Sequence, residues 1–577
     1  MIKNICADEL ENVRTRLNRL YGPAKADTLT NRFVSLLGRY GIGYGRPQKP
    51  ERWDEDTTLL ITYGDMISEP GERPLQTLKK FVDEKARDAI SAIHILPFSP
   101  YSSDDGFSVI DYREVDPALG KWKDIAAIGK EYKLMADLVL NHCSRKGPWF
   151  KNYAAGVAPF RDYFIEVDPN TDLSAVVRPR SLPLLSEVKT QQGLKHLWTT
   201  FSSDQVDLNF KNPDVLFDFL DILLYYISMG ARIIRLDAIA YLWKAPGTPC
   251  IHLNQTHEVV KLMRSLLNMA APDTVLLTET NVPHDENISY FGNSDEAHMV
   301  YNFSLPPLLL HALLNGTGKY LTRWAVEVSE PPAECTYLNF TASHDGIGVR
   351  PLQGLIPEKE LTSLVEHVEK LGGQVSTKRN SDGTDSPYEL NITYFDALGS
   401  PSQSGLNVQI QRFICSQSIA MALKGVPAVY FHSLVGTRNW TEGVEQTGRA
   451  RTINRRKWDK RELDNLLADS GSVHAQVFHE YERRLRIRRQ QPAFHPDATQ
   501  QVLNFSDEIF AFLRETDRQS ILCISNLTDR PQEISIDGHF AAIETTKPYT
   551  DLLSGQRYSG AVKQLQLQPY QTLWLTC

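Results

Sequence analysis

A guanidinium and a carboxylate stand two residues apart at the end of an apolar run near the middle of the chain. In ARIIRLDAIAYLWK, residues 231–244, the run from Ile233 to Asp237 reads as a buried parallel strand. Side chains two apart on a strand point the same way, so Arg235 and Asp237 share a face. A guanidinium beside a carboxyl group favours the ionised form, which a carboxylate nucleophile requires. We therefore expect Asp237 to be ionised and nucleophilic.

A second carboxylate, Glu279, closes another apolar run, VLLTE at 275–279. Sugar transfer with retention requires two carboxylates about 5 Å apart. One attacks the anomeric carbon, and the other protonates the leaving oxygen and then deprotonates the acceptor. Partial burial and the charge of Asp237 should keep Glu279 protonated before attack. A glycosyl ester on Asp237 would remove that charge, lower the pKa of Glu279 and ready it as the base.

A third carboxylate, Asp345, follows His344 in ASHDGIG, residues 342–348. In a retaining site such a group holds sugar hydroxyls through charge-assisted hydrogen bonds. The same dipeptide is equally consistent with a turn. The residues alone leave both interpretations open.

The elements that must position these groups alternate in type along the chain. Short apolar runs are separated by helical patterns such as 215–228 and 257–269, and polar groups close several of the runs. This alternation predicts an α/β protein, a (β/α)8 TIM barrel, in which reactive groups lie where strands run into loops. The strand candidates are 58–63, 92–98, 134–140, 233–237, 275–279, 299–303, 337–340 and 428–431.

The catalytic barrel is expected to span 56–489, after an N-terminal helical extension at 1–55 that ends in a linker. Two connections are too long for simple loops: a small inserted domain at 143–206 after the third strand, and a polar, glycine-containing flap at 346–393 after the seventh. Both leave the reactive face and can cover a substrate. Alternating runs at 490–577 predict a C-terminal antiparallel β domain, a β-sandwich.

The composition is that of an ordinary globular protein, with 577 residues, 42% of them hydrophobic, and a formal net charge of -8. The charges are dispersed, which argues against nucleic acid or an anionic membrane as a partner. No apolar run is long enough to span a bilayer, and the N-terminus lacks the apolar core of a secretory signal. We expect a cytoplasmic enzyme, monomeric or homodimeric, that acts on small molecules.

No metal or cofactor is indicated by the sequence. The seven cysteines are far apart and form no CxxC pair, so neither a disulfide framework nor a zinc site is expected. Cys143 beside His142 fits either a thiol–imidazole pair or, more commonly, a buried and inert thiol. Asp104 and Asp105 supply too few oxygens for a hard cation, which favours sugar binding. GIGYG at 41–45 lacks the lysine of a phosphate loop.

Several motifs resemble those of the α-amylase superfamily of retaining enzymes, glycoside hydrolase family 13. Their order and spacing cover the whole expected barrel. The resemblance implies that Asp237 is the nucleophile, Glu279 the acid/base and Asp345 a transition-state stabiliser. The matching stretches are ADLVLNH (136–142), ARIIRLDAIAY (231–241), LLTET (276–280) and FTASHD (340–345).

Within that superfamily the chain looks like the sucrose phosphorylase subfamily. The resemblance is carried by ITYGD (61–65), HILPFSPYSSDDGFSVIDYREVDPALGKW (94–122), TTFSSDQVDLN (199–209), YELNITYFDAL (388–398) and RTINR (451–455). It implies a pocket for the donor glucose and a site for phosphate, which would be a co-substrate. The implied substrate-binding residues are Asp104, Phe107, His142, Arg180, Gln205, Arg235, Tyr241, His344, Tyr388, Glu389 and Arg451.

A phosphorylase must let phosphate compete with abundant water for the glucosyl enzyme, and this requires fixed positive charge. The resemblance implies that Arg180, next to Arg178 in RPR, supplies this charge together with Tyr388. Without the resemblance, an exposed surface fork would be the simpler interpretation of two such arginines.

The donor is a separate question. Sucrose phosphorylases generally lack the N-terminal extension and carry Tyr-Gln where this chain has Tyr388-Glu389. Extension, flap and DEAHMVYNFSLPP (295–307) look most like glucosylglycerate phosphorylases, which convert 2-O-α-glucosyl-D-glycerate and phosphate to α-glucose 1-phosphate and glycerate. An anionic leaving group and an anionic attacker would use one cationic pocket in turn, which suits Arg180, Arg178 and either Lys378 or Arg379.

Other functions remain open on the sequence. Glucosylglycerol phosphorylase is the nearest rival, and sucrose or sucrose 6-phosphate phosphorylase follows. A hydrolase or transglucosidase of the same superfamily would use the same carboxylates without phosphate. A barrel that has lost catalysis would be a binding subunit, which the intact Asp237, Glu279 and Asp345 argue against.

Overall fold

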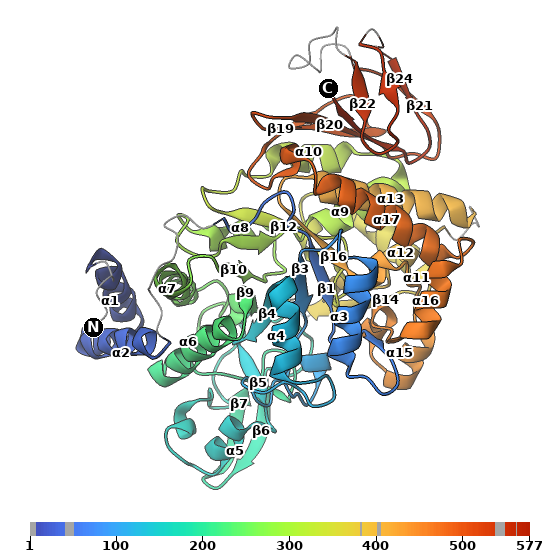
Figure 1. The fold of residues 1–577 in the computed structure, drawn as a ribbon. Coiled ribbons are helices and arrows are strands. Elements are labelled where there is room, and N and C mark those ends of the chain that lie inside the picture. Colours follow the sequence, from blue (N-terminus) through green and yellow to red (C-terminus); the bar gives the residue numbers. More distant parts are fainter. Residues whose placement is uncertain are drawn as a thin grey trace.

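The computed structural model describes residues 7–40, 51–380, 384–400, 405–536, 548–560, 562 and 564–577. At its centre eight parallel strands close into a barrel in the order β1-β16-β12-β11-β10-β9-β4-β3 (Figure 1). The α/β TIM-barrel fold predicted from the sequence is confirmed. The strands are β1 (Leu59–Thr62), β3 (Ala92–Ile95), β4 (Lys133–Val139), β9 (Ala231–Asp237), β10 (Val275–Thr278), β11 (Met299–Tyr301), β12 (Thr336–Asn339) and β16 (Val426–Tyr430).

The observed strand ends differ from the expected ones by a few residues. Strand β10 stops at Thr278, so Glu279 is the first residue beyond it rather than its last. A run of apolar side chains shows where a buried strand lies. The strand itself ends where its backbone hydrogen bonds end, and the sequence does not show that point.

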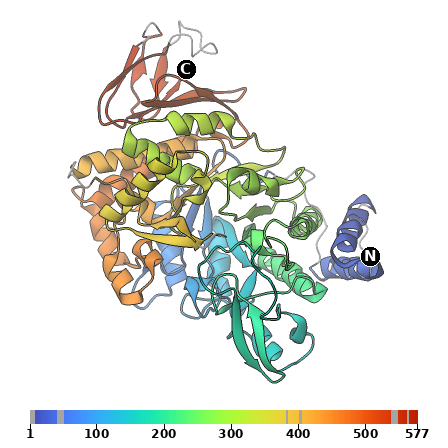
Figure 2. The same cartoon turned by 180° about the vertical axis from the view of Figure 1, so that it is seen from behind.

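Helices cover the outside of the barrel and bury apolar side chains against it (Figures 1 and 2). In α6, for example, Leu216, Leu220 and Leu223 are fully buried. The helices between barrel strands are α3 (Pro74–Lys85), α4 (Trp122–Glu131), α6 (Pro213–Ser228), α7 (Asn254–Ala270), α8 (His284–Ile288), α9 (Leu305–Asn315), α10 (Lys319–Glu327), α12 (Tyr394–Ala397) and α13 (Leu406–Ala422), and those after β16 are α14 (Phe431–Leu434), α15 (Thr441–Thr447), α16 (Lys460–Ala468) and α17 (Val473–Arg488).

The connection after β4 forms a small domain at one end of the barrel (Figure 1). It begins and ends in a two-stranded antiparallel sheet of β5 (His142–Ser144) and β8 (Gln205–Asp207), which ties both ends of the insertion to the barrel mouth. Between them lie α5 (Pro148–Ala154) and the hairpin of β6 (Leu185–Thr190) and β7 (Gly193–Trp198).

The connection after β12 is more structured than the expected flap. It contains β13 (Ile347–Gly348), α11 (Glu358–Lys370), β14 (Gln374–Arg379) and β15 (Asp385–Asn391), with the strands in the order β13-β15-β14. Helix α11 buries Leu364 and Val368, which belong to the same apolar core as the barrel and so hold the segment against it. Of the expected flap, residues 381–383 lie outside the described residues.

Two N-terminal helices, α1 (Ala7–Tyr21) and α2 (Pro23–Arg39), pack against each other, and α1 packs on α7 (Figure 2). Val13 and Phe33 are fully buried and belong to the same apolar core as the barrel. Arg16 lies 3.1 Å from Asp295 and 3.4 Å from Glu258. The helical extension is therefore docked on the barrel; most of its expected linker, residues 41–50, lies outside the described residues.

The C-terminal part is antiparallel. Its six strands follow the order β18-β19-β20-β25-β22-β23, a second sheet pairs β21 with β24, and the two share an apolar core that includes Leu522 and Leu567. The strands are β18 (Thr499–Leu503), β19 (Ile509–Glu515), β20 (Ser520–Asn526), β21 (Gln532–Ser535), β22 (Tyr549–Asp551), β23 (Arg557–Tyr558), β24 (Gln564–Leu567) and β25 (Thr572–Thr576).

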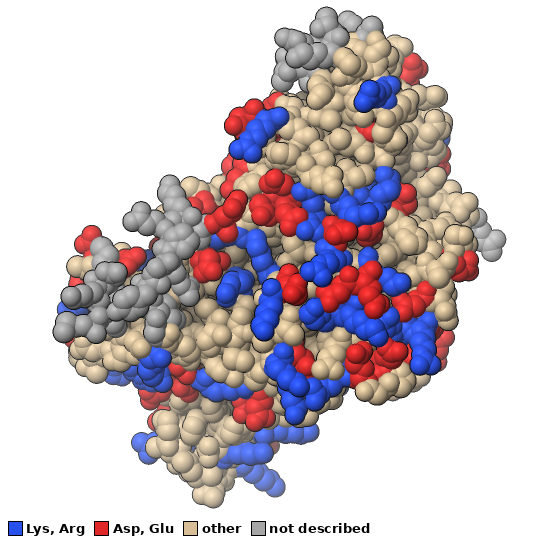
Figure 3. Space-filling model, in the orientation of Figure 1, with Lys and Arg blue, Asp and Glu red and all other residues tan. Residues whose placement is uncertain are grey.

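Basic and acidic side chains lie side by side over much of the face in Figure 3. Among the described helices, none has both the length and the apolar composition that crossing a bilayer requires.

Candidate active site

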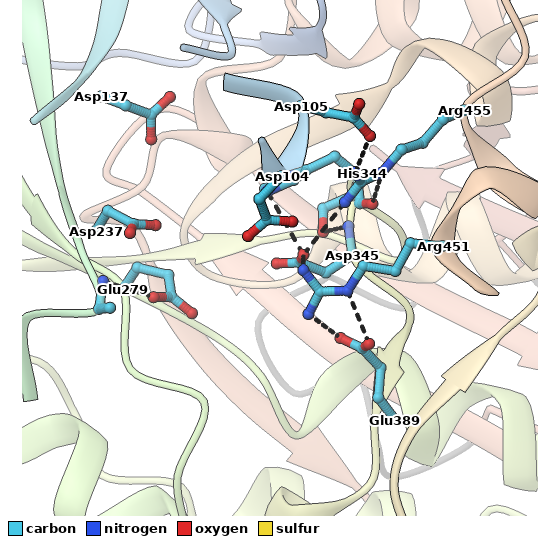
Figure 4. A network of polar contacts seen from close by, with 12 residues as sticks. Asp104, Asp105, Asp137, Asp237, Glu279, His344, Asp345, Glu389, Arg451 and Arg455 are labelled. Carbon is cyan, nitrogen blue, oxygen red and sulfur yellow. Dashed lines mark hydrogen bonds and ion pairs between the residues drawn. The ribbon is translucent and has the colours of Figure 1, made fainter. Parts of the chain in front are cut away.

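Asp237 and Glu279 meet at the mouth of the barrel because their strands are neighbours in register. Leu236 of β9 pairs with Thr278 of β10, so each carboxylate follows a paired position. The Glu279 amide donates to Leu236 O at 3.1 Å, and the Ala238 amide donates to Glu279 Oε2 at 2.9 Å. Figure 4 shows the two side chains next to each other.

Arg235 holds this pair from below. Its Nη1 lies 2.8 Å from Asp237 Oδ1 and 2.5 Å from Asp137 Oδ1, and its Nη2 lies 4.0 Å from Glu279 Oε2. Asp137 in turn lies 2.6 Å from His94 Nε2. The Arg235 side chain is only 3% exposed and does not line the pocket. It therefore contacts the carboxylates and not a ligand in the pocket.

The ionisation of Asp237 expected from its neighbour Arg235 stays a prediction, because burial opposes the effect of the guanidinium. Burial raises the pKa of Asp237 from 3.8 to about 7, against the opposing charge of Arg235, and the charge of Asp137 adds to the rise. The pKa of Glu279 is also raised by burial, from 4.5 to about 7, with a contribution from Asp237. Two buried carboxylates at close range hold one proton between them near neutral pH. Arg235 lies nearer Asp237, which favours the charge on Asp237 and the proton on Glu279.

Asp345 faces the pair across the pocket (Figure 4). Its Oδ1 lies 2.5 Å from Arg451 Nη1 and 3.8 Å from Arg455 Nη2. Burial disfavours its charge, but Arg451 and Arg455 hold the pKa of Asp345 well below the ordinary value. These two arginines favour the ionised form of Asp345, which can then accept hydrogen bonds in the pocket.

Glu389 closes the other side of Arg451. Its oxygens accept from Arg451 Nε at 3.0 Å and Nη2 at 2.9 Å, a bidentate pair in which the Glu389 side chain is 1% exposed. Arg451 is therefore shared between two carboxylates, one from β15 and one from the loop after β12.

These groups surround one pocket at the mouth of the barrel. All the substrate-binding and catalytic residues implied by the family resemblance line it, except Arg235. The lining residues that the sequence had not singled out include Phe201, Thr280, Asn281 and Val282. Phe201 lies within the motif at 199–209, and residues 280–282 directly follow Glu279. Their closeness to these motifs is the feature of the sequence that could have identified them.

One wall is built from the turn at 104–107. Asp104 Oδ2 accepts from Gln205 Nε2 at 3.1 Å, and the Phe107 ring stacks on His344 at 4.8 Å between centroids. Asp104 and Asp105 both adopt left-handed backbone conformations, with φ of 55° and 47°. This tight turn sends Asp105 to Arg455 instead of the pocket. Within the described residues, no group of acidic, histidine or cysteine side chains could hold a metal ion.

The histidines of the pocket are neutral. Burial lowers the pKa of His142 and of His344, and His142 Nε2 lies 2.8 Å from Phe107 O. Burial also raises the pKa of the Cys143 thiol, which favours the inert thiol over a thiol–imidazole pair.

The pocket is lined by two guanidinium groups, and they differ in their partners. Arg451 is bound by Asp345 and Glu389, whereas Arg180 has no ion-pair partner in the part of the chain that the structure describes. Its guanidinium carbon lies 5.9 Å from the centre of the Tyr388 ring. Arg180 is therefore the pocket-lining cation whose charge is free to bind an anion.

Two other cations expected near the anion are engaged elsewhere. Arg178 donates to Leu182 O. Arg379 is exposed and lies 3.0 Å from Asp385 Oδ1, so the expectation that Arg379 joins the pocket is wrong. In the β14–β15 hairpin Arg379 pairs with Asp385, a register that the sequence did not reveal.

Two family models match parts of the chain. Residues 89–326 match the family model of the alpha amylase catalytic domain, and residues 500–574 match that of the maltogenic amylase C-terminal domain. The chain is 43% identical to a glucosylglycerate phosphorylase of Spirochaeta thermophila, and the match covers 99% of each chain. A glucosylglycerol phosphorylase of Marinobacter adhaerens is 28% identical over 87% of this chain and 98% of its own.

Among solved structures, a sucrose 6F-phosphate phosphorylase from Thermoanaerobacter thermosaccharolyticum superposes with a TM-score of 0.73. The match covers 89% of this chain and 100% of the other, at 23% identity. At that identity the likeness concerns the fold.

Proposed function

The chain belongs to the α-amylase family, glycoside hydrolase family 13, within its phosphorylase branch, and we propose that it is a retaining glucosylglycerate phosphorylase. The reaction is 2-O-α-glucosyl-D-glycerate plus phosphate to α-D-glucose 1-phosphate plus D-glycerate. The observation that carries this proposal is the combination of a paired nucleophile and acid with a free guanidinium in one pocket. The relative at 43% identity over nearly the full length of both chains supports the choice of donor.

The first displacement needs an ionised Asp237 and a protonated Glu279. Asp237 attacks the anomeric carbon while Glu279 gives its proton to the bridging oxygen, so the glycosidic bond breaks and glycerate leaves. Asp345, ionised throughout, accepts hydrogen bonds from the glucose hydroxyls, and these strengthen as the ring distorts. Arg235 holds the Asp237 carboxylate in position while the ester bond forms.

The second displacement reverses these roles. Esterified Asp237 no longer carries charge, so the pKa of Glu279 falls and the ionised group accepts a proton from the incoming phosphate. A phosphate oxygen attacks the anomeric carbon, the ester bond breaks and Asp237 is released. Two inversions restore the α configuration. Arg180 holds the phosphate against competing water because it is fixed beside Tyr388 and has no carboxylate to neutralise it.

Glycerate is favoured over glycerol as the leaving group by the charge of the site and by the comparisons. The relative named for glucosylglycerol is 28% identical, against 43% for the one named for glucosylglycerate. Sucrose and sucrose 6-phosphate remain the other candidates in this branch.

The test is a reverse-direction screen. α-Glucose 1-phosphate is offered with glycerate, glycerol, fructose or fructose 6-phosphate, and phosphate release is measured. Glycerate is expected to give the highest kcat/KM. Release at an equal rate without any acceptor would instead indicate a hydrolase, and a clear preference for another acceptor would replace glycerate in the proposal.

A further inference from the structure

The turn that brings Asp104 into the pocket has an unfavourable backbone conformation. Asp104, Asp105 and Gly106 have successive positive φ angles of 55°, 47° and 108°. Left-handed backbone is unfavourable for a residue with a Cβ, and a Cβ at Gly106 would lie 2.7 Å from Pro97 O. Such a backbone persists where surrounding contacts hold it. The contacts of this turn therefore decide where the Asp104 carboxylate lies.

Residues of the insertion after β4 hold the two ends of the turn. Asp204 accepts from Ser103 Oγ at 2.5 Å and from Ser108 Oγ at 2.8 Å. The next residue, pocket-lining Gln205, donates from Nε2 to Asp104 Oδ2 at 3.1 Å. The insertion thus fixes the residues that flank the turn.

Arg455 holds the middle of the turn from another part of the chain. Its Nη1 is paired with Asp105 Oδ2, and its Nε donates to His344 O at 2.8 Å (Figure 4). Its Nη2 lies 3.8 Å from Asp345 Oδ1, and the side chain is 5% exposed. Arg455 therefore joins the turn to the loop that carries His344 and Asp345.

The turn and this loop also meet inside the pocket. The rings of Phe107 and His344 stack with 4.8 Å between their centroids and 6° between their planes. Both residues line the pocket, as do Asp104 and Asp345. A shift of the turn relative to the loop would therefore change the shape of the sugar site.

The link between Asp105 and Arg455 is ionic. Burial disfavours the charge of Asp105, but the Arg455 guanidinium lowers the pKa of Asp105 below its ordinary value. The second oxygen of Asp105, Oδ1, lies 3.7 Å from the exposed Arg449. Of these two arginines, the buried Arg455 is the one that also binds the His344 carbonyl.

We propose that Asp105 is a positioning residue, which binds Arg455 and thereby holds Asp104 in place against the donor sugar. Asp104 lines the pocket and Asp105 does not, so Asp105 affects the reaction without touching the substrate. This inference rests on the proposed function, because the sugar held by Asp104 is the donor glucose of that reaction.

The experiment measures kcat/KM for α-glucosyl fluoride in the full-length enzyme at saturating phosphate. Asp105→Gly removes the carboxylate, but glycine adopts the left-handed backbone readily. It should lower kcat/KM about 10-fold, the low end for losing a hydrogen bond between charged groups. Asp105→Asn should recover part of this loss, because its carboxamide oxygen can still accept from Arg455.

A double-mutant cycle separates positioning from a general structural role. If Asp105 acts through Asp104, adding Asp105→Gly to Asp104→Asn should lower kcat/KM by less than about 3-fold further. A role independent of Asp104 would give the same loss in both backgrounds. Should Asp105→Gly fail to fold, as judged by urea unfolding, Asp105→Asn takes its place in the cycle.

Arg449→Gln is the matched control, because Arg449 faces the same carboxylate from an exposed position. It should leave kcat/KM unchanged. A loss in Arg449→Gln as large as that in Asp105→Gly would overturn the inference, since the general charge around Asp105 would then explain the effect.

Unchanged kcat/KM in Asp105→Gly would also overturn the inference, as would equal losses with and without Asp104→Asn. If the wild-type enzyme did not convert α-glucosyl fluoride and phosphate to α-glucose 1-phosphate, the proposed function itself would fail. Normal wild-type turnover with an unaffected Asp105→Gly variant would contradict only the positioning role.

Discussion

Glu389 binds one edge of the Arg451 guanidinium, with Nε at 3.0 Å and Nη2 at 2.9 Å from the carboxylate oxygens. The remaining nitrogen of Arg451, Nη1, lies 2.5 Å from Asp345 Oδ1. Glu389 thus fixes the arginine that sets the position of the third carboxylate. It also neutralises Arg451, so that a second anion in the pocket is drawn to Arg180 instead.

Glu389→Ala should destabilise the fold, because it leaves a buried guanidinium with one partner fewer. We expect the free energy of unfolding to fall by about 3 kcal/mol, the low end for breaking a buried pair, since Arg451 keeps Asp345. Glu389→Gln should cost less, because one hydrogen bond remains. Urea unfolding of both variants measures this. Loss of less than about 0.5 kcal/mol in both would mean that the pair is not structurally important.

Asp237→Asn should stabilise the protein at alkaline pH while abolishing turnover. The folded-state pKa of Asp237, about 7, lies above its ordinary value of 3.8, so ionisation favours the unfolded chain. This cost is absent below about pH 4, grows between about pH 4 and 7, and is complete above that range. The free energy of unfolding of the variant should therefore exceed that of the wild type by about 4 kcal/mol at pH 8 and differ little from it at pH 4. The opposite pH trend in urea unfolding would contradict the raised pKa.

Glu279→Gln should slow the enzyme in a way that depends on the leaving group. With glucosylglycerate the loss should be about 100- to 10,000-fold, because the leaving alkoxide needs a proton. With α-glucosyl fluoride, which leaves without one, the loss should be below about 10-fold. Steady-state rates on both donors test this. Equal losses would remove Glu279 from the role of general acid.

Arg180→Ala should divert the glucosyl enzyme to water. We expect the ratio of glucose to α-glucose 1-phosphate to rise at least about 10-fold at fixed phosphate, because a charged hydrogen bond to the acceptor is lost. Arg178→Ala, which removes a donor to Leu182 O, is the control. An unchanged product ratio in Arg180→Ala would take Arg180 out of the phosphate site.

The sequence predicts the barrel well because buried parallel strands leave a strong record in composition. Runs such as VLLT before Glu279 and IIRL before Asp237 mark strands whose carboxyl ends must meet. Helix α11 in the insertion was not predicted, because it buries only Leu364 and Val368 and so leaves a weak apolar pattern in the sequence. The prediction of a simple polar flap there missed this helix.

Charges that depend on tertiary contacts could not be predicted from the sequence. Arg235 beside Asp237 predicts an ionised acid, but burial and the charge of Asp137, a residue 98 positions from Arg235, raise the pKa of Asp237 against the effect of the guanidinium. In the same way, Arg379 and Lys378 are neighbours in sequence, but strand alternation and Asp385 send Arg379 outward. Proximity in sequence does not determine which ionic partner a side chain meets.

The central claim is that glucose passes through a temporary ester on Asp237 and is then taken by phosphate. The most direct measurement is proton NMR of the sugar phosphate first formed from 2-O-α-glucosyl-D-glycerate and phosphate. Two displacements predict the α anomer of glucose 1-phosphate, formed only when phosphate is present. Initial formation of the β anomer, or of free glucose at a rate independent of phosphate, would contradict the account.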